Sequence, residues 1–149
     1  MRAVVQRVSR ARVTVADEAI GQIGAGLLVY AAAGVDDTAA DVGYLAEKIA
    51  HLRIFPDEAG KMNRDVSQAG GAVLLVSAFT VHADARKGRR PSFDSSAPGA
   101  VAEPLITELG RALQEYGVEV QTGRFAAYML VESVNDGPIC LLLDSRRVF

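Results

Sequence analysis

Residues 135–143 read Asn-Asp-Gly-Pro-Ile-Cys-Leu-Leu-Leu, and the rest of the chain can be read outward from them. The chain-breaking pair Gly137-Pro138 separates the apolar run Tyr128–Val131 from the apolar run Ile139–Leu143. Proline fixes its own φ and holds the preceding residue out of the helical region, so the pattern predicts two strands joined by a short, rigid connection. Taken alone, this connection is a hairpin turn. The alternative is a cis Gly-Pro bond, a form that about 5–6% of X–Pro bonds adopt.

Apolar patterning predicts strands along most of the remaining chain. β-Branched residues dominate stretch 2–16, which reads as one bent strand or a strand pair. The run Leu27–Ala33 is apolar throughout, which is typical of a strand buried on both faces. Further strands are expected at 19–23, 72–81, 118–122, 126–134 and 139–143.

Two stretches show the three- and four-residue spacing of an amphipathic helix. The first follows the capping residues Asp36-Asp37-Thr38 and ends near Arg53, with its stripe at Val42, Leu45, Ile49 and Leu52. The second has Pro104 in its first turn or at a kink, Gly117 as its C-terminal cap, and a stripe at Val101, Leu105, Leu109, Leu113 and Tyr116. Helices and strands together predict a mixed α/β (α+β) fold, with antiparallel and mixed sheet packed against two helices in one domain, residues 1–149.

Composition narrows the setting of the protein. The chain has 149 residues, of which 50% are hydrophobic and 23% charged, as in ordinary globular domains. Cys140 is its one cysteine, so no internal disulfide can form and a reducing compartment is expected. The N-terminal residues lack a signal-peptide pattern, and the longest apolar run is too short to span a membrane. A cytoplasmic location without membrane contact is therefore expected.

The basic residues are unevenly distributed. Net charge is −2, yet four basic residues lie within five positions at Arg86, Lys87, Arg89 and Arg90. They fall in stretch 82–97, which is rich in charge, Ser, Pro and Gly and is expected to be a long loop. Two interpretations stay open: a solvated loop, or a surface that binds nucleic-acid phosphates without reading sequence.

Several kinds of chemistry find no support in the sequence. Two histidines and one cysteine provide no set of metal ligands at a known spacing, so neither a metal nor a cofactor is expected. Glycines 21, 24 and 26 have the Rossmann order reversed and precede a strand. Ser77 and His82 are five residues apart on an expected strand, which would place them on opposite faces. An enzyme of this sequence would therefore rely on backbone groups or on its substrate.

Two motifs resemble those of the D-aminoacyl-tRNA deacylases. Residues 77–81, Ser-Ala-Phe-Thr-Val, are similar to the family motif Ser-Gln-Phe-Thr-Leu. Residues 135–140, Asn-Asp-Gly-Pro-Ile-Cys, are similar to Asn-x-Gly-Pro-x-Thr. The resemblance runs end to end and includes Met1–Val8, Leu52–Phe55, Gly60–Asn63, Arg86–Phe93 and Thr122–Phe125.

This resemblance implies a partial β-barrel and a homodimer with active sites at the subunit interface. Such a protein hydrolyses the ester between a D-amino acid and the terminal adenosine of tRNA, and also removes glycine from mischarged tRNA. The Gly137-Pro138 bond would be cis and would enter the pocket of the other subunit. Its carbonyl oxygens would occupy the space that an L side chain needs, so that L-substrates are excluded while glycine passes.

The resemblance also implies roles for individual residues. The 2′-hydroxyl of the tRNA would assist catalysis, and main-chain N–H groups around Ala78-Phe79 would stabilise the oxyanion. Phe79 would pack near the terminal adenosine, while Ser77 and Thr80 would form the hydrogen bonds of the pocket.

Other residues would shape the substrate site. Phe125 and Met129 would form its apolar walls, and Asn135 would belong to the chirality filter with Gly137 and Pro138. The tRNA phosphates would be bound by Arg86, Lys87, Arg89 and Arg90.

Three residues depart from the family pattern. Ala78 stands in place of glutamine, Cys140 in place of threonine, and Ala126 where glycine is common. These departures bear on rate and substrate range more than on reaction type. Ala78 and Cys140 keep open the alternative of an inactive dimeric homologue. The basic run 86–90 keeps open a second alternative, a tRNA-binding module without catalysis.

Overall fold

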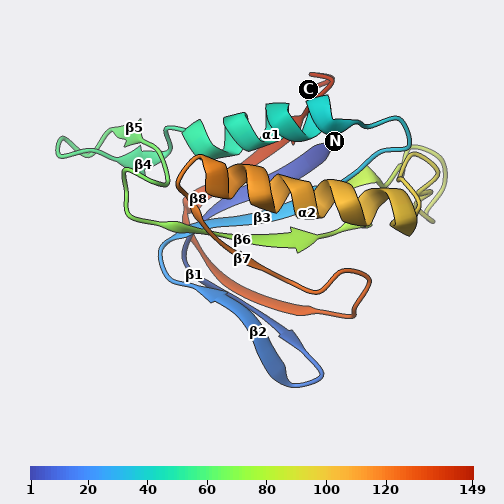
Figure 1. Ribbon diagram of the computed structural model, residues 1–149, viewed down its shortest axis with the longest axis horizontal. Coiled ribbons are helices and arrows are strands. Elements are labelled where there is room, and N and C mark those ends of the chain that lie inside the picture. Colours follow the sequence, from blue (N-terminus) through green and yellow to red (C-terminus); the bar gives the residue numbers. More distant parts are fainter.

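The computed structural model describes residues 1–149 and contains two α-helices, one 3-10 turn and eight strands (Figure 1). In chain order these are β1 (Arg2–Val15), β2 (Glu18–Ile23), β3 (Gly26–Ala32), α1 (Ala39–His51), β4 (Phe55–Pro56), β5 (Met62–Arg64), β6 (Ala72–Ser77), the 3-10 turn η1 (Phe79–His82), α2 (Gly99–Glu115), β7 (Glu119–Thr122) and β8 (Leu130–Asp144). The mixed α/β class expected from the sequence is confirmed.

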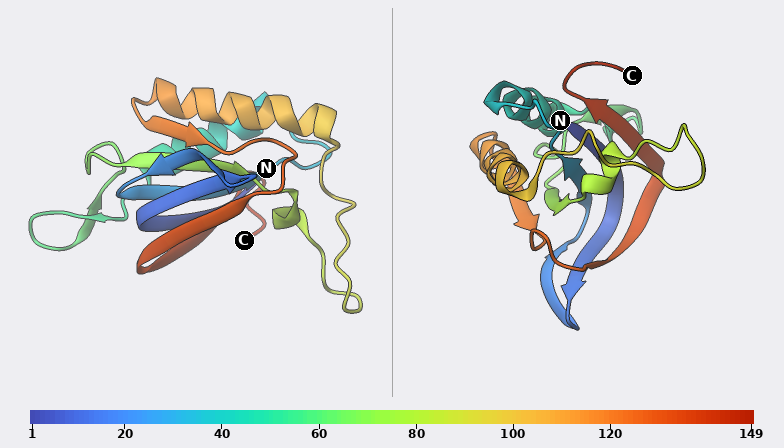
Figure 2. Two further views of the ribbon diagram at one scale, coloured as in Figure 1. Left: turned by 90° about the horizontal axis from the view of Figure 1, so that it is seen from below. Right: turned by 90° about the vertical axis from the view of Figure 1, so that its right-hand side faces the viewer.

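Strand β1 organises the main sheet. Its order is β2-β1-β3-β6-β7, and β8 also pairs with β1. β1 runs antiparallel to β2, β3 and β8, whereas β6 runs parallel to β3 and β7. Because β2 also contacts β6 and β7, the sheet curls into the nearly closed, barrel-like form visible in Figure 2. The expected partial barrel is therefore confirmed.

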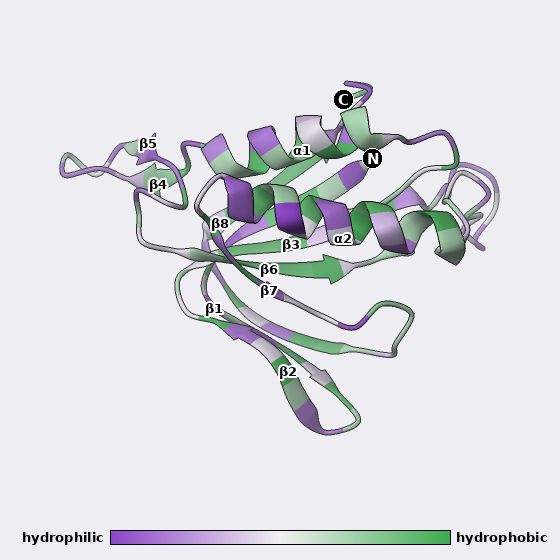
Figure 3. Cartoon of the chain, viewed as in Figure 1, coloured by the Kyte–Doolittle hydropathy of each residue, from purple (hydrophilic) through white to green (hydrophobic).

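Apolar side chains fill both faces of the curled sheet. Helices α1 and α2 pack against each other and cover one face, where Val29 of β3 and Leu45 of α1 belong to the larger core (Figure 1). A smaller core on the other face contains Leu28, Leu74 and Val13. Strand β3 is thus buried on both faces, as its apolar run predicts, and Figure 3 shows the corresponding apolar centre of the sheet.

Helix α1 begins and ends close to its predicted bounds. Thr38 is the N-cap, and its backbone N–H donates to Asp41 Oδ2 at 2.8 Å, which satisfies one of the free donors of the first turn. The predicted stripe is buried at Val42, Leu45 and Ile49.

Helix α2 differs from expectation in two details. Its buried stripe is Ala102, Ile106, Leu109, Gly110 and Leu113, whereas Val101 and Tyr116 are exposed. Pro104 lies inside the helix beyond the first turn, because the helix already begins at Gly99. Gly117 closes the helix with a φ of 76°, the left-handed conformation that glycine tolerates best.

The C-terminal hairpin predicted around Gly137-Pro138 is wrong. Residues 130–144 form one strand, β8, which pairs with β1 from Thr14↔Leu130 to Arg2↔Asp144. Val8 pairs with Asn135 and Gln6 with Cys140, so residues 136–139 protrude as a bulge. β1 is a continuous template for both halves, and the glycine and proline interrupt the pairing only locally. Residues 126–129, expected in a strand, precede β8 as a loop.

The strand predicted at 72–81 is also shorter than expected. It ends at Ser77, and the chain then enters turn η1. The face alternation expected for Ser77 and His82 therefore does not apply. A two-stranded ribbon of β4 and β5 was not predicted.

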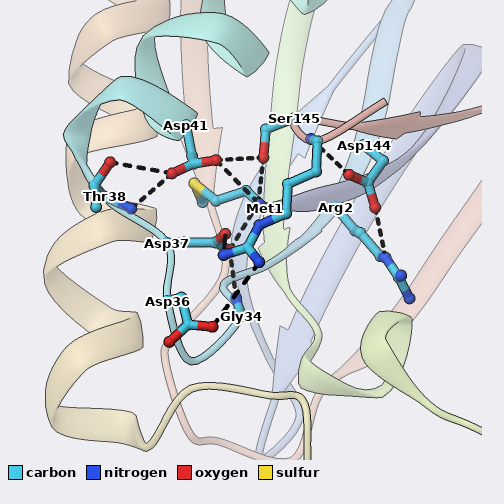
Figure 4. A network of polar contacts seen from close by, with 10 residues as sticks. Met1, Arg2, Gly34, Asp36, Asp37, Thr38, Asp41, Asp144 and Ser145 are labelled. Carbon is cyan, nitrogen blue, oxygen red and sulfur yellow. Dashed lines mark hydrogen bonds and ion pairs between the residues drawn. The ribbon is translucent and has the colours of Figure 1, made fainter. Parts of the chain in front are cut away.

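A buried polar network ties the start of β1 to the end of β8 and to the loop before α1 (Figure 4). The Met1 amino nitrogen lies 2.7 Å from Asp37 Oδ2 and donates to Ser145 Oγ at 2.6 Å. Ser145 Oγ in turn donates to Asp41 Oδ1 at 2.6 Å. None of the helices combines the length and the apolar character needed to cross a bilayer.

Candidate active site

An open, mainly apolar pocket of about 700 Å³ lies where strands β3 and β6 end. These strands are parallel, with Ala31 paired to Ser77, so their carboxyl ends meet at one edge of the sheet. Six predicted site residues line this pocket together: Ser77, Ala78, Phe79, Thr80, Phe125 and Met129. Its lining contains no carboxylate, histidine, lysine or cysteine, which leaves the phenols of Tyr30 and Tyr128 as the only titratable side chains on its wall.

Turn η1 lies at this pocket, and two of its backbone N–H groups have no acceptor. The Ala78 N–H donates to the Ala31 carbonyl oxygen at 2.9 Å and is thus engaged in the fold. Hydrogen bonds in a 3-10 turn join residue i to i+3, so the N–H groups of Phe79 and Thr80 have no acceptor within the turn. Of the expected pair Ala78-Phe79, the Phe79 N–H is therefore open and the Ala78 N–H is not, and the Thr80 N–H is open beside it.

Aromatic side chains surround the pocket mouth. Phe79 is 58% exposed, and its ring packs edge-to-face on Phe93 with a centroid distance of 5.0 Å. Tyr128 is 83% exposed on the same lining. Exposed rings at the mouth of an apolar pocket suit stacking of nucleobases.

Two residues of the 123–129 loop have unusual backbone surroundings. A Cβ at Gly123 would lie 2.6 Å from Met129 Sδ, so glycine lets Met129 pack into the pocket wall. Ala126 has a φ of 57°, a conformation in which glycine would be less strained than alanine.

The bulge 136–139 is held at its base but does not reach the pocket of its own chain. Asn135 Nδ2 donates to the Ile139 carbonyl oxygen at 2.8 Å and to the Arg7 carbonyl oxygen at 3.1 Å. Arg7 Nε lies 3.1 Å from Asp136 Oδ2 as an ion pair. The Gly137–Pro138 bond is cis, as the resemblance implies, and both residues are exposed. Asn135, Gly137 and Pro138 are thus separate from the other site residues within one chain.

The basic loop, residues 83–94, projects from the body of the protein (Figure 2). Its arms are joined by two backbone hydrogen bonds between Asp84 and Ser92, of 2.8 and 2.9 Å. Arg86 Nε and Nη2 donate to the Asp84 carboxylate at 2.9 and 2.6 Å, which holds the pKa of Asp84 well below its usual range. Arg86 is therefore occupied by the loop itself. Lys87, Arg89 and Arg90 are exposed and form no ion pair.

Many residues of the pocket wall were not predicted from the sequence. Small residues at the end of β3 and the start of α2, together with Phe93 and Tyr128, complete its wall. Alanine and glycine carry no chemical signature, and the parallel pairing of β3 with β6 is what brings them to the site. No group of three His, Cys, Asp or Glu side chains is placed to hold a metal ion.

Residues 4–144 match the sequence profile of the family described as D-Tyr-tRNA(Tyr) deacylase. The chain belongs to the D-Tyr-tRNA(Tyr) deacylase family. A relative from Symbiobacterium thermophilum, named D-aminoacyl-tRNA deacylase, is 54% identical over 100% of this chain and 99% of its own.

Solved structures share the fold of this chain. The structure titled c-Myc DNA Unwinding Element Binding Protein is 36% identical, with a TM-score of 0.91 over 97% of this chain and 98% of its own. A probable eukaryotic D-amino acid tRNA deacylase shares the fold, with a TM-score of 0.84 at 16% identity over 95% of this chain and 97% of its own.

Proposed function

We propose that this protein hydrolyses the ester bond of D-aminoacyl-tRNA and releases the free amino acid and tRNA. Family membership supports the reaction class. The observation that carries the mechanism is an apolar pocket with two open backbone N–H groups and no acidic or basic side chain on its wall. Such a pocket suits a substrate that brings its own reactive hydroxyl.

The reaction follows from this arrangement. Water attacks the ester carbonyl carbon, and negative charge develops on the carbonyl oxygen. The N–H groups of Phe79 and Thr80 stabilise that charge, a contribution that costs about 10²–10³ in rate when one such donor is removed. The ribose 2′-hydroxyl, vicinal to the ester, accepts a proton from the attacking water and passes its own proton to the 3′-oxygen. The bond between the carbonyl carbon and the 3′-oxygen then breaks, which leaves a free carboxyl group and a 3′-hydroxyl. Ser77 orients the substrate and is not the nucleophile.

Selection against L-amino acids is assigned to the bulge of a second subunit. In one chain the bulge lies away from the pocket, so it can act as a filter only on a partner. Exposed apolar residues on the same strand, Leu130, Val134 and Leu142, support coverage of β8 by another copy. Carbonyl oxygens of Gly137 and Pro138 then occupy the position of an L side chain. Because the glycyl group has no side chain, glycyl-tRNA is not excluded by these oxygens and is hydrolysed.

The basic loop supplies contacts to the tRNA backbone. Lys87, Arg89 and Arg90 are free to pair with phosphates, whereas the Arg86 guanidinium is held by Asp84. These contacts position the tRNA and add affinity that falls with salt.

Deacylation assays test the proposal. D-Tyr-tRNA and Gly-tRNA are hydrolysed, L-Tyr-tRNA is spared, and Ser77→Ala retains turnover, whereas a terminal 2′-deoxyadenosine abolishes it. Loss of turnover in a folded Ser77→Ala variant, with the deoxy substrate still cleaved, would make the serine a nucleophile. Binding of charged and uncharged tRNA without turnover would leave only an RNA-binding module. Sedimentation at micromolar concentration reports the expected dimer.

A further inference from the structure

His82, the last residue of η1, is buried without a hydrogen-bonding partner. Its residue surface is 7% exposed, and neither ring nitrogen has a partner in hydrogen-bonding geometry. The large majority of buried side-chain polar atoms in proteins are paired, so an unpaired imidazole beside a candidate site calls for an explanation. His82 does not line the pocket, which excludes it as a general base acting on the substrate there.

Three segments meet around the His82 ring. A Cβ at Gly34 would lie 3.2 Å from His82 Cε1, 3.2 Å from Asp37 Oδ2 and 3.4 Å from the Ser95 carbonyl oxygen. These atoms come from η1, from the loop before α1, and from the strap, which we define as residues 95–97. The ring is therefore packed with no room for an added methyl group at Gly34.

Hydrogen bonds fix the strap to the other two segments. Ser95 Oγ donates to the His82 carbonyl oxygen at 3.1 Å, and the Ser95 carbonyl oxygen accepts from the Val35 N–H at 3.2 Å. The Ala97 N–H donates to the Ala33 carbonyl oxygen at 2.9 Å. The strap connects the basic loop to α2, so the base of the proposed tRNA-binding loop is fixed to the His82 segment.

The surroundings of the ring favour its neutral form. Burial lowers the pKa of His82 below its ordinary value, and the positive charges of Arg2 and the Met1 amino group act in the same direction. Asp37 and the Ala32 carbonyl oppose this effect. However, the Asp37 carboxylate is already engaged by the Met1 amino nitrogen at 2.7 Å and by Arg146 Nη2 at 3.5 Å.

We propose that His82 is a positioning residue, whose uncharged ring holds η1, the 33–37 loop and the strap in register behind the pocket. Ala33 and Ala97 line the pocket directly, and η1 presents the Phe79 and Thr80 donors to it. When the ring takes up a proton, burial and the positive charges of Arg2 and Met1 outweigh the Ala32 carbonyl and the already engaged Asp37 carboxylate. The cation then leaves its site, and the three segments separate. The pocket then loses its donors, and deacylation stops in acid. The kinetic part of this inference rests on the proposed function.

Histidine NMR tests the structural part without substrate. The chain has two histidines, so a His51→Gln variant assigns the remaining resonances to His82. The His82 ring should titrate below the ordinary histidine value of about 6.5, and the Thr80 and Ala97 amides should shift with the same midpoint. An ordinary midpoint, or a His82 titration that leaves these amides unchanged, overturns the proposal.

Kinetics test the functional part with D-Tyr-tRNA from about pH 5 to about pH 8. Wild type should lose kcat/KM about tenfold per pH unit below the NMR midpoint. His82→Ala should lower kcat/KM at every pH. His82→Phe should restore kcat/KM near pH 7 and should not show its decline in acid. His51→Phe should show the same decline in acid as wild type. A decline in acid that survives in His82→Phe with the same midpoint overturns the positioning role. Absence of turnover in wild type refutes the proposed function instead and leaves the NMR result to decide the role of His82.

Discussion

Asn135 is the residue whose loss should separate catalysis from stereochemical selection. Its side-chain amide donates to Arg7 and Ile139 carbonyl oxygens at 3.1 and 2.8 Å and thereby closes the base of the bulge. Asn135→Ala removes both bonds. A typical intramolecular hydrogen bond contributes about 1 kcal/mol, so the loss should be about 2 kcal/mol.

The loss of these two hydrogen bonds destabilises the bulge and not the pocket. A change of 1–2 kcal/mol corresponds to a factor of roughly 5–30 in a two-state population, so bulges displaced from the filtering position become that much more common. Hydrolysis of L-Tyr-tRNA should rise by a similar factor. Hydrolysis of D-Tyr-tRNA should change less than about threefold, because no pocket residue of the same chain is touched.

The assay compares kcat/KM for the two enantiomers and the free energy of unfolding in urea. Ile49→Val is the control, because Ile49 is fully buried on the core face of α1 and the substitution costs about 1 kcal/mol far from the bulge. The control should lose stability and keep its selectivity. If Asn135→Ala loses about 2 kcal/mol and still spares L-Tyr-tRNA, the two hydrogen bonds do not hold the filter and the reasoning fails.

Other predictions address the loops and the core. Ala126→Gly should raise the unfolding free energy by up to about 1 kcal/mol, because relief of the left-handed alanine outweighs the added chain entropy; a lower Tm would refute this. Each of the variants Lys87→Ala, Arg89→Ala and Arg90→Ala should reduce the slope of log K for tRNA binding against log salt concentration by about 0.7–0.9. Arg111→Ala is the control and should leave the slope unchanged, because Glu108 and Glu115 already hold the Arg111 guanidinium. Although partial burial opposes it, hydrogen bonds from Ser145 and Thr38 lower the pKa of Asp41. Asp41→Asn should therefore cost about 1 kcal/mol at pH 7, and the difference from wild type in urea melts should vanish as pH falls through that lowered value, since the native carboxylate is then protonated. Gly26→Ala should fold poorly in soluble expression and circular dichroism, because its Cβ would collide with the Ala72 carbonyl oxygen of the neighbouring strand.

Local signals in the sequence were sufficient for most elements. The cap at Thr38, the stripe of α1 and the run 27–33 each depend on residues close in sequence, and each was predicted correctly. The bulge was mistaken for a hairpin because its conformation depends on β1, more than 120 residues away, as the pairing of Val8 with Asn135 shows. No short stretch of sequence around Gly137 contains Val8 or any other residue of β1.

Part of the site was predictable, because that part is formed by residues close to one another in sequence. The contiguous motif 77–80 reaches the pocket as a unit, and Phe125 and Met129 join it. The identity of the open donors was not predictable, because it depends on the bond from the Ala78 N–H to Ala31 on another strand. The ion pair of Arg86 was not predictable either, because a run of basic residues does not show that the Asp84 carboxylate binds one of them.

The pairing of β1 with β8 has a consequence for the order in which the molecule acquires its parts. Arg2 pairs with Asp144, and the bulge lies on the strand that joins last in sequence. Contacts this distant in sequence form slowly, because the loop between them must close before they contribute. The ends of β3 and β6, with η1 and the start of α2, can assemble earlier from a shorter span of chain. We therefore expect newly made molecules to acquire most of the pocket before the bulge, and a chain caught between these stages would be the least discriminating form of the protein.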